Sequence, residues 1–172
     1  MSGEYHEAVE AQRHQIYTFA FYSLKNREDA EDVTQEVLIR LWKHWQKLDK
    51  GGIKAWITKV TRNLCCDFVR QRVRRSNEAD AEDMPVDALP SASDPQADAE
   101  SEDFKRRLTA ALRQVPEPYR SALILREIQD FKYDEIADAL DKPLNTVKVY
   151  IHRGRKMLRK ELKEESVYVE AS

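Results

Sequence analysis

The chain has 172 residues, of which 41% are hydrophobic and 35% are charged, with only four glycines and six prolines. This length and apolar content are enough for one medium or two small domains with buried cores, which argues against disorder of the whole chain. Few glycines and many charged residues favour helices and nearly exclude an all-β protein. The net charge of −2 gives no sign of nucleic-acid binding when it is taken as an average.

The compartment is indicated by the apolar stretches and the cysteines. The longest charge-free apolar stretch, residues 14–24, is far shorter than the roughly 20 residues of a membrane span, and it follows glutamates rather than the basic lead of a signal peptide. The two cysteines, Cys65 and Cys66, are adjacent, so they cannot build a disulfide framework and form a poor zinc site. We therefore expect a soluble, cytoplasmic protein with no membrane insertion, metal or cofactor.

Acidic residues are concentrated in one segment, residues 77–103. It holds ten acidic residues and no basic one, so removing its charge from the net −2 leaves the rest of the chain at +8. It also contains three prolines, no aromatic residue, and neither a helical nor a strand period. This composition is typical of an extended, self-repelling linker. The predicted organisation is two domains with a linker and a tail: residues 1–76, linker 77–102, residues 103–165 and tail 166–172.

Three helices are predicted before the linker, because apolar residues recur there at helical spacing. The first covers about residues 5–24. The second begins near Asn26, a plausible N-cap ahead of Glu28 and Asp29. The third contains an apolar stripe from Ile53 to Phe68, which we interpret as core.

After the linker, a helical face ends before Pro116 and a second apolar pattern follows it. A short helix over 134–140 and a long basic helix from Thr146 are then separated by a tight turn that contains Asp141, a residue that tolerates the left-handed conformation. This is the pattern of a helix-turn-helix, with an ordinary helical hairpin as the alternative. Residues 142–163 carry eight basic residues against one acidic residue, which favours DNA binding.

Three motifs occur in an order that is typical of one protein family. They are Asp29-Ala-Glu-Asp-Val-Thr-Gln-Glu36, Ala55-Trp-Ile-Thr-Lys-Val-Thr-Arg-Asn63 followed by Asp67-Phe-Val-Arg70, and Tyr133-Asp-Glu-Ile-Ala137 with Pro143-Leu-Asn-Thr-Val-Lys148. With these motifs the chain resembles, over about residues 5–162, the extracytoplasmic-function (ECF) sigma factors of the sigma-70 family. The resemblance implies an all-α protein in which a region 2-like helical bundle and a region 4-like helix-turn-helix are joined by the acidic linker.

The resemblance predicts that the second helix, which is acidic, binds core RNA polymerase. In the family this helix docks on the arginine-rich clamp coiled coil of the β′ subunit, and the matching positions here are Asp29, Asp32, Gln35 and Glu36. Carboxylates and an amide on one face suit bidentate arginine partners. The alternative is that these acidic residues only complement the helix dipole, which leaves Gln35 and Glu36 unexplained.

The third helix resembles the part of the family that recognises and melts the promoter −10 element. Melting costs about a few kcal/mol per extruded base, so the flipped base has to be captured in a pocket. The resemblance places Asn63 beside that pocket and Leu64 and Cys65 in its wall. The residues expected to hold phosphates are Lys59, Arg62, Arg70 and Arg74. A helix C-cap is an equally good interpretation of Asn63, and a small buried residue is the favoured interpretation of at least one cysteine.

The C-terminal domain resembles the family's reader of the −35 element. Residues near the start of its basic helix are expected to face the major groove, and residues farther along to face the DNA backbone. The expected DNA contacts are Asn145, Thr146, Lys148, Val149, His152 and Arg153, followed by Arg155 and Lys156 nearer the backbone. The apolar face around Tyr119, Leu123 and Ile128 could serve the family's contact with the β-subunit flap or simply form core.

The function that the sequence favours is that of a promoter-specificity subunit, which binds core polymerase and promoter DNA and makes or breaks no bond itself. No paired carboxylates, nucleophile with its base or phosphate loop is visible, so neither an enzyme nor a small-molecule substrate is expected. An anti-sigma factor is a possible further partner. The alternatives are a free-standing helix-turn-helix regulator and an adaptor that recruits a partner through its acidic helix.

Overall fold

The computed structural model describes the backbone of residues 2–76 and 95–170 and the side chains of residues 3–75 and 101–164. Within these ranges every regular element is helical, which confirms the predicted all-α fold. The elements are α1 (Ser2–Leu24), α2 (Arg27–His44), the 3₁₀ turns η1 (Trp45–Lys47) and η2 (Lys50–Gly52), α3 (Ile53–Ser76), α4 (Pro95–Gln114), α5 (Tyr119–Leu123), the π-helical turn η3 (Ile124–Ile128), α6 (Tyr133–Leu140) and α7 (Leu144–Glu170).

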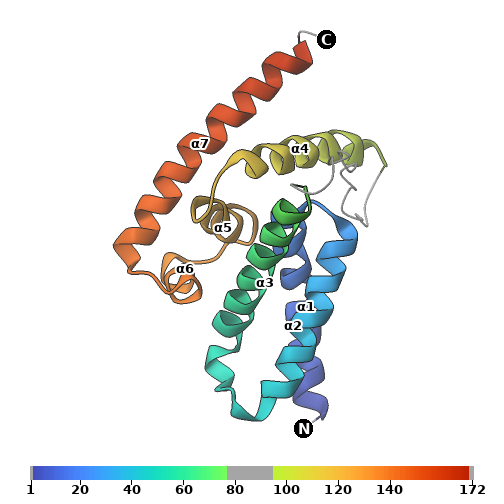
Figure 1. The fold of residues 1–172 in the computed structure, drawn as a ribbon, viewed down its shortest axis with the longest axis vertical. Helices are drawn as coiled ribbons and strands as arrows, with labels where there is room; N and C mark the ends of the chain where they lie inside the picture. Colours follow the sequence, from blue (N-terminus) through green and yellow to red (C-terminus); the bar gives the residue numbers. More distant parts are fainter. Residues whose placement is uncertain (1, 77–94, 171–172) are drawn as a thin grey trace.

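The first three α-helices lie side by side as a bundle (Figure 1). Their inward faces carry the apolar residues predicted from helical spacing, and Ile16, Val33 and Leu41 are almost completely buried. The N-cap of α2 is Asn26, as predicted, because its side-chain oxygen accepts a hydrogen bond of 3.1 Å from the backbone N–H of Asp29. This bond satisfies one of the free donors at the start of the helix.

Arg72, near the end of α3, joins the turn between α1 and α2. Its Nη1 donates a 3.0 Å hydrogen bond to the carbonyl of Leu24, the last residue of α1. Its Nη2 forms an ion pair with the carboxylate of Asp29 in the first turn of α2. One partly buried guanidinium therefore holds the ends of all three helices of the bundle together.

The second half contains the helix-turn-helix that the sequence predicts. Asp141, between α6 and α7, has φ 56° and ψ 49°, so it occupies the left-handed conformation that ends α6. Helix α7 packs closely on α5 at Gly154, where an added Cβ would lie 3.0 Å from Cγ of Leu123. A side chain at position 154 would therefore need the Leu123 side chain to shift by a few tenths of an ångström.

Two element boundaries differ from the prediction. Helix α4 begins at Pro95, inside the segment predicted to be an extended linker, and residues 77–94 of that segment lie outside the described residues. Proline is favoured at the first helical position, and acidic residues in the following turns complement the helix dipole. Helix α7 continues to Glu170, into the predicted tail.

The two halves of the chain are in contact. Helix α6 lies beside α3, and α1 touches both α4 and η3 (Figure 1). None of the helices within the described residues has the length and apolar character needed to cross a membrane.

Candidate polymerase and DNA interfaces

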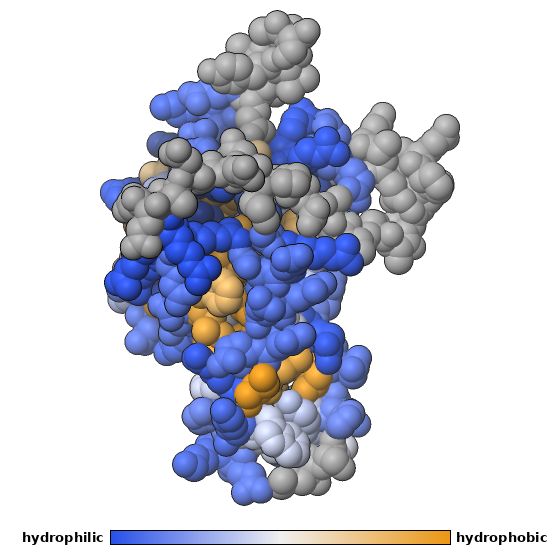
Figure 2. All heavy atoms as spheres, turned by 45° about the vertical axis from the view of Figure 1, so that its right-hand side comes forward, coloured by the Kyte–Doolittle hydropathy of each residue, from blue (hydrophilic) through white to orange (hydrophobic). Residues whose placement is uncertain are grey.

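One face of α2 combines polar and apolar side chains that are exposed to solvent. Asp32 and Gln35 are exposed, and they are followed at helical spacing by Ile39 and Trp42, which are 49% and 53% exposed. Figure 2 shows apolar atoms at the lower end of the molecule, where the C-terminal part of α2 lies in Figure 1. The Trp42 ring rests edge-on against Tyr5 of α1, with 4.9 Å between centroids. We call Asp32, Gln35, Ile39 and Trp42 the α2 stripe.

The other two acidic residues predicted to bind polymerase have partners within the chain. Asp29 is half-buried and paired with Arg72, so it contributes to the bundle itself. The Oε1 of Glu36 lies 2.9 Å from Nε of Arg40, one turn later on the same helix. The structure therefore leaves Asp32 and Gln35 as the more available members of the predicted set.

A second face, on α3, presents residues predicted to bind the −10 element. Lys59, Asn63, Arg70 and Arg74 are all exposed, and their spacing places them on one side of the helix. Asn63 lies in the middle of α3, which continues to Ser76, so its interpretation as a helix C-cap is wrong. The four residues form what we call the α3 face.

Leu64 and Cys65 point away from the α3 face into the core of the bundle. They are 7% and 3% exposed, so neither offers a surface to DNA in this arrangement of the chain. Burial strongly raises the pKa of the Cys65 thiol, and it also raises the pKa of the half-buried Cys66 thiol. Both thiols are therefore neutral near pH 7. The burial of Cys65 confirms the prediction of a small buried residue at one or both of these positions.

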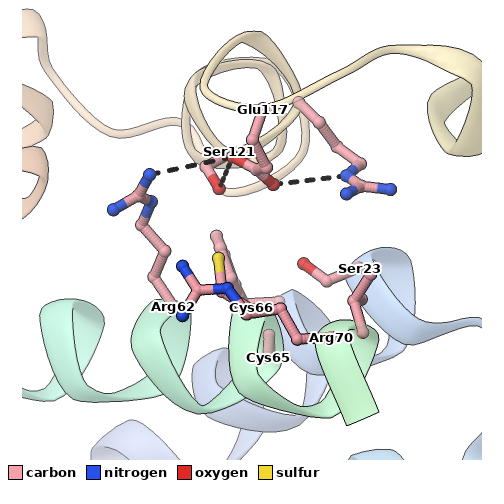
Figure 3. Close-up of a pocket in the computed structure, with 10 residues that line it drawn as sticks. Ser23, Arg62, Cys65, Cys66, Arg70, Glu117 and Ser121 are labelled. Atoms are coloured by element: carbon pink, nitrogen blue, oxygen red, sulfur yellow. Dashed lines mark hydrogen bonds and ion pairs between the residues drawn. The ribbon is translucent and has the colours of Figure 1, made fainter. Parts of the chain in front are cut away.

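Arg62, the remaining predicted −10 residue, lines a pocket of about 240 Å³ between the two halves (Figure 3). Its Nη2 lies 4.0 Å from Oε2 of Glu117, which precedes α5. The same carboxylate group accepts a 2.6 Å hydrogen bond from Ser121 and lies 3.2 Å from Nε of Arg120. Cys66 lines this pocket from the α3 side. Arg62 is therefore engaged with the second half of the chain.

A third face, on α7, contains most of the residues predicted to contact the −35 element. The opposite face of the helix is held in the core by Val147 and Ile151. Thr146 is half-buried, and Arg155 forms an ion pair with Glu127 of η3, which raises the pKa of its guanidinium. The exposed members, which we call the α7 face, are Asn145, Lys148, Val149, His152, Arg153 and Lys156.

An apolar groove of about 370 Å³ opens between α4, α7 and the α5–η3 segment. Its floor includes Leu123 and Ile128, two of the residues considered for a contact with the β flap, whereas Tyr119 packs edge-on against Tyr150. The wall contributed by α4 includes Phe104, which is 52% exposed. This groove could accept an apolar segment of a partner protein.

Family models and relatives identify the family of the chain. The model of sigma-70 region 2 matches residues 8–75, and the model of sigma-70 region 4 matches residues 105–158. The ECF RNA polymerase sigma factor SigX of Bacillus subtilis is 32% identical over 154 residues, which cover 86% of this chain and 77% of that protein. The chain belongs to the ECF sigma factors of the sigma-70 family.

Other relatives of this ECF sigma factor extend the comparison. The ECF RNA polymerase sigma factor SigE of Mycolicibacterium smegmatis is 37% identical over 162 residues, which cover 93% of this chain but only 62% of that longer protein. Among solved structures, the sigma factor RpoE of Bartonella quintana, in complex with the anti-sigma factor NepR, has the same fold with a TM-score of 0.72. It is 22% identical, and the match covers 93% of this chain and 97% of that one.

Sequence reasoning missed two features of this ECF sigma factor. Ile39 and Trp42 complete the α2 stripe, and their helical spacing from Asp32 was visible in the sequence, although apolar residues at that spacing are more often core. The engagement of Arg62 by Glu117 carried no sequence signal, because 55 positions separate the two residues. The predicted roles of the site residues in binding polymerase and DNA stay predictions.

Proposed function

We propose that this ECF sigma factor binds core RNA polymerase through the α2 stripe and directs transcription initiation by contacting the −10 and −35 elements with its α3 and α7 faces. The observation that carries the proposal is the α2 stripe itself. Carboxylate, amide, isoleucine and tryptophan side chains are exposed together on one face. Protein interfaces typically bury such an aromatic side chain against the partner and surround it with polar groups. Polymerase performs the bond-forming chemistry.

The two DNA-facing surfaces differ in their proposed tasks. On the α3 face, cations would hold phosphates while Asn63 reads an extruded base with its amide group. On the α7 face, Asn145 and Lys148 lie near the start of the helix, where residues of a helix-turn-helix reach base edges. The apolar groove beside α4 supports a second polymerase contact, for which the β flap is the proposed partner. An anti-sigma factor, like the partner of the Bartonella quintana protein, is a proposed regulator.

The test is co-elution with purified bacterial core RNA polymerase on a sizing column at micromolar concentration. The wild-type chain should co-elute, and Asp32→Arg should lose about 90% or more of the bound fraction, because it places a cation against an arginine-rich partner. Glu10→Arg, which makes the same change at an exposed position of α1, is the matched control and should bind normally. Failure of the wild-type chain to co-elute, or equal binding by both variants, would refute the proposal.

The promoter sequence can be identified with the same purified chain and polymerase. Run-off transcription with the reconstituted polymerase on a genomic fragment library should yield transcripts that share −35 and −10 sequences upstream of their start sites. Transcription that is independent of the chain would contradict the proposed role in promoter selection.

A further inference from the structure

The α7 face has one apolar member, Val149, among polar and basic side chains. Val149 is 43% exposed. A β-branched residue is a weaker helix former than alanine or leucine, so valine at an exposed helical position does not improve the helix. Single exposed apolar residues are common on protein surfaces. Whether this one has a function therefore depends on where it points.

The buried side of α7 fixes the direction of Val149. Val147 and Ile151, two residues before and two residues after it, are 0% and 1% exposed. At about 100° per residue, each of them lies about 160° around the helix from Val149, which therefore points directly away from the core. Asn145, one turn earlier, is exposed and lies only about 40° from Val149. The two residues form what we call the central row of α7.

Contacts on both sides of the buried face hold α7 against rotation about its own axis. On one side, the ring of Tyr150 packs edge-on against Tyr119, with 5.6 Å between centroids. On the other side, the guanidinium of Arg155 forms an ion pair with Glu127 of η3. The outward direction of the central row is therefore set by the fold.

Basic side chains flank the central row. Lys148 and Arg153 are exposed and lie about 80° and 60° from the middle of the row, on opposite sides of it. A helix in the major groove turns its flanks toward the two phosphate backbones and its centre toward the base edges. The row also lies in the first two turns of α7, which begins at Leu144 close to α6 (Figure 1). These are the turns of a recognition helix that contact bases.

The two side chains of the central row match the two bases of an A·T pair. A carboxamide such as that of Asn145 can bond to both N6 and N7 of adenine. The isopropyl group of Val149 forms no hydrogen bond, and the apolar group that the major groove presents to it is the 5-methyl of thymine. The two residues are separated by about 6 Å along the helix, which corresponds to about two base-pair steps of about 3.4 Å.

We propose that the central row makes this chain selective for A·T pairs in the −35 element. Asn145 reads an adenine, and Val149 contacts the methyl group of a thymine within about two base pairs of it. This inference rests on the proposed function and extends it by naming the bases. It requires that uracil cannot replace that thymine without loss, although the two bases pair with adenine in the same way.

The test uses the full-length chain reconstituted with core polymerase and the promoter recovered by run-off transcription. Each thymidine of the −35 element is replaced singly by deoxyuridine, which lacks only the 5-methyl group. At one position the replacement should weaken filter binding about fourfold, the effect expected for one buried methyl group. The same analogue placed between the two elements should leave binding unchanged.

Two variants connect this effect to Val149. In Val149→Ser the ratio of thymidine to deoxyuridine binding at the sensitive position should fall below about 1.5, because the apolar partner of the methyl group is gone. Leu144→Ser is the matched control, since Leu144 is 42% exposed but lies about 140° around the helix from Val149. It should keep the fourfold ratio. Each ratio compares two DNAs on one protein, so a general loss of affinity does not alter it.

A second analogue tests Asn145. In 7-deazaadenine the N7 acceptor is replaced by C–H, so at one adenine of the −35 element it should weaken binding about fivefold or more. Asn145→Ala should remove this sensitivity, whereas Val149→Ser should keep it. Circular dichroism checks that each variant retains its helices.

Three results would overturn the inference while leaving the proposed function. They are a −35 element without an A·T pair, full tolerance of deoxyuridine at every thymidine by the wild-type chain, and undiminished discrimination in Val149→Ser. If Val149→Ser does not bind at all, the deoxyuridine series on the wild-type chain still decides. Failure of the reconstituted polymerase to bind any promoter would instead refute the proposed function, and this inference with it.

Discussion

Helices α3 and α7 differ in how far their basic residues are engaged inside the chain. On α7, the exposed cations are directed away from a core that holds the opposite side of the helix. On α3, Arg62 faces Glu117, and the neighbouring Lys54 faces Glu135, both carboxylates belonging to the other half. Two clusters of similar charge in the sequence are therefore one open surface and one partly covered surface. The density of basic residues in the sequence therefore does not predict whether their side chains are free to contact DNA.

The sharpest test of this contrast removes charge from the open surface. Replacing Lys148 and Arg153 together by alanine should weaken promoter binding by the reconstituted polymerase about 100-fold, since each such contact contributes about 1–3 kcal/mol. Filter binding on the promoter recovered from the library measures the effect. The matched control replaces Arg106 and Arg113, two exposed arginines of α4, and should change binding by less than about threefold. Equal losses would show a general charge effect and not recognition by α7.

A substitution on the buried side of α3 should change the stability of the fold. Leu64→Ala should lower the free energy of unfolding by about 2–4 kcal/mol, because it leaves a cavity in the bundle core. Urea denaturation measures the change, and transcription at low temperature should start from the same promoter. A stable variant with altered promoter choice would instead place Leu64 in contact with DNA.

Substitution of Asn63 should have the opposite effect and change DNA melting without changing stability. Because its side chain is exposed, Asn63→Ala should leave stability within about 0.5 kcal/mol. It should nevertheless reduce open-complex formation about tenfold, since a lost base contact costs about 1–3 kcal/mol. Permanganate footprinting measures open complexes, and filter binding measures closed ones. An equal loss in both assays would remove the base-reading role.

The smallest expected effect concerns the turn that sets the α7 face. Asp141→Gly should raise the free energy of unfolding by no more than about 1 kcal/mol, because glycine adopts the left-handed conformation of this position without a Cβ penalty. Asp141→Val should lower it by about 1–2 kcal/mol, since a β-branched residue is strained there. Thermal unfolding of the two variants provides the comparison. A stabilising valine would contradict the turn geometry.

Local signals in the sequence predicted the fold well. Asn26 is an N-cap and Asp141 a left-handed turn residue because short-range chemistry decides both, and helical spacing identified the buried residues of α1 to α3. The start of α4 was missed because acidic composition was taken as a sign of extension, although acidic residues also stabilise the start of a helix. The contacts of Lys54 with Phe131 and Glu135 lie beyond local reasoning, since they depend on how two halves meet.

The position of Arg72 links the helices proposed to bind polymerase and DNA. Because one guanidinium joins the last turn of α1, the first turn of α2 and the end of α3, these helices form a single rigid unit. Under the proposed function, binding of polymerase to α2 would therefore also fix the orientation of α3 toward the DNA, because Arg72 joins the two helices.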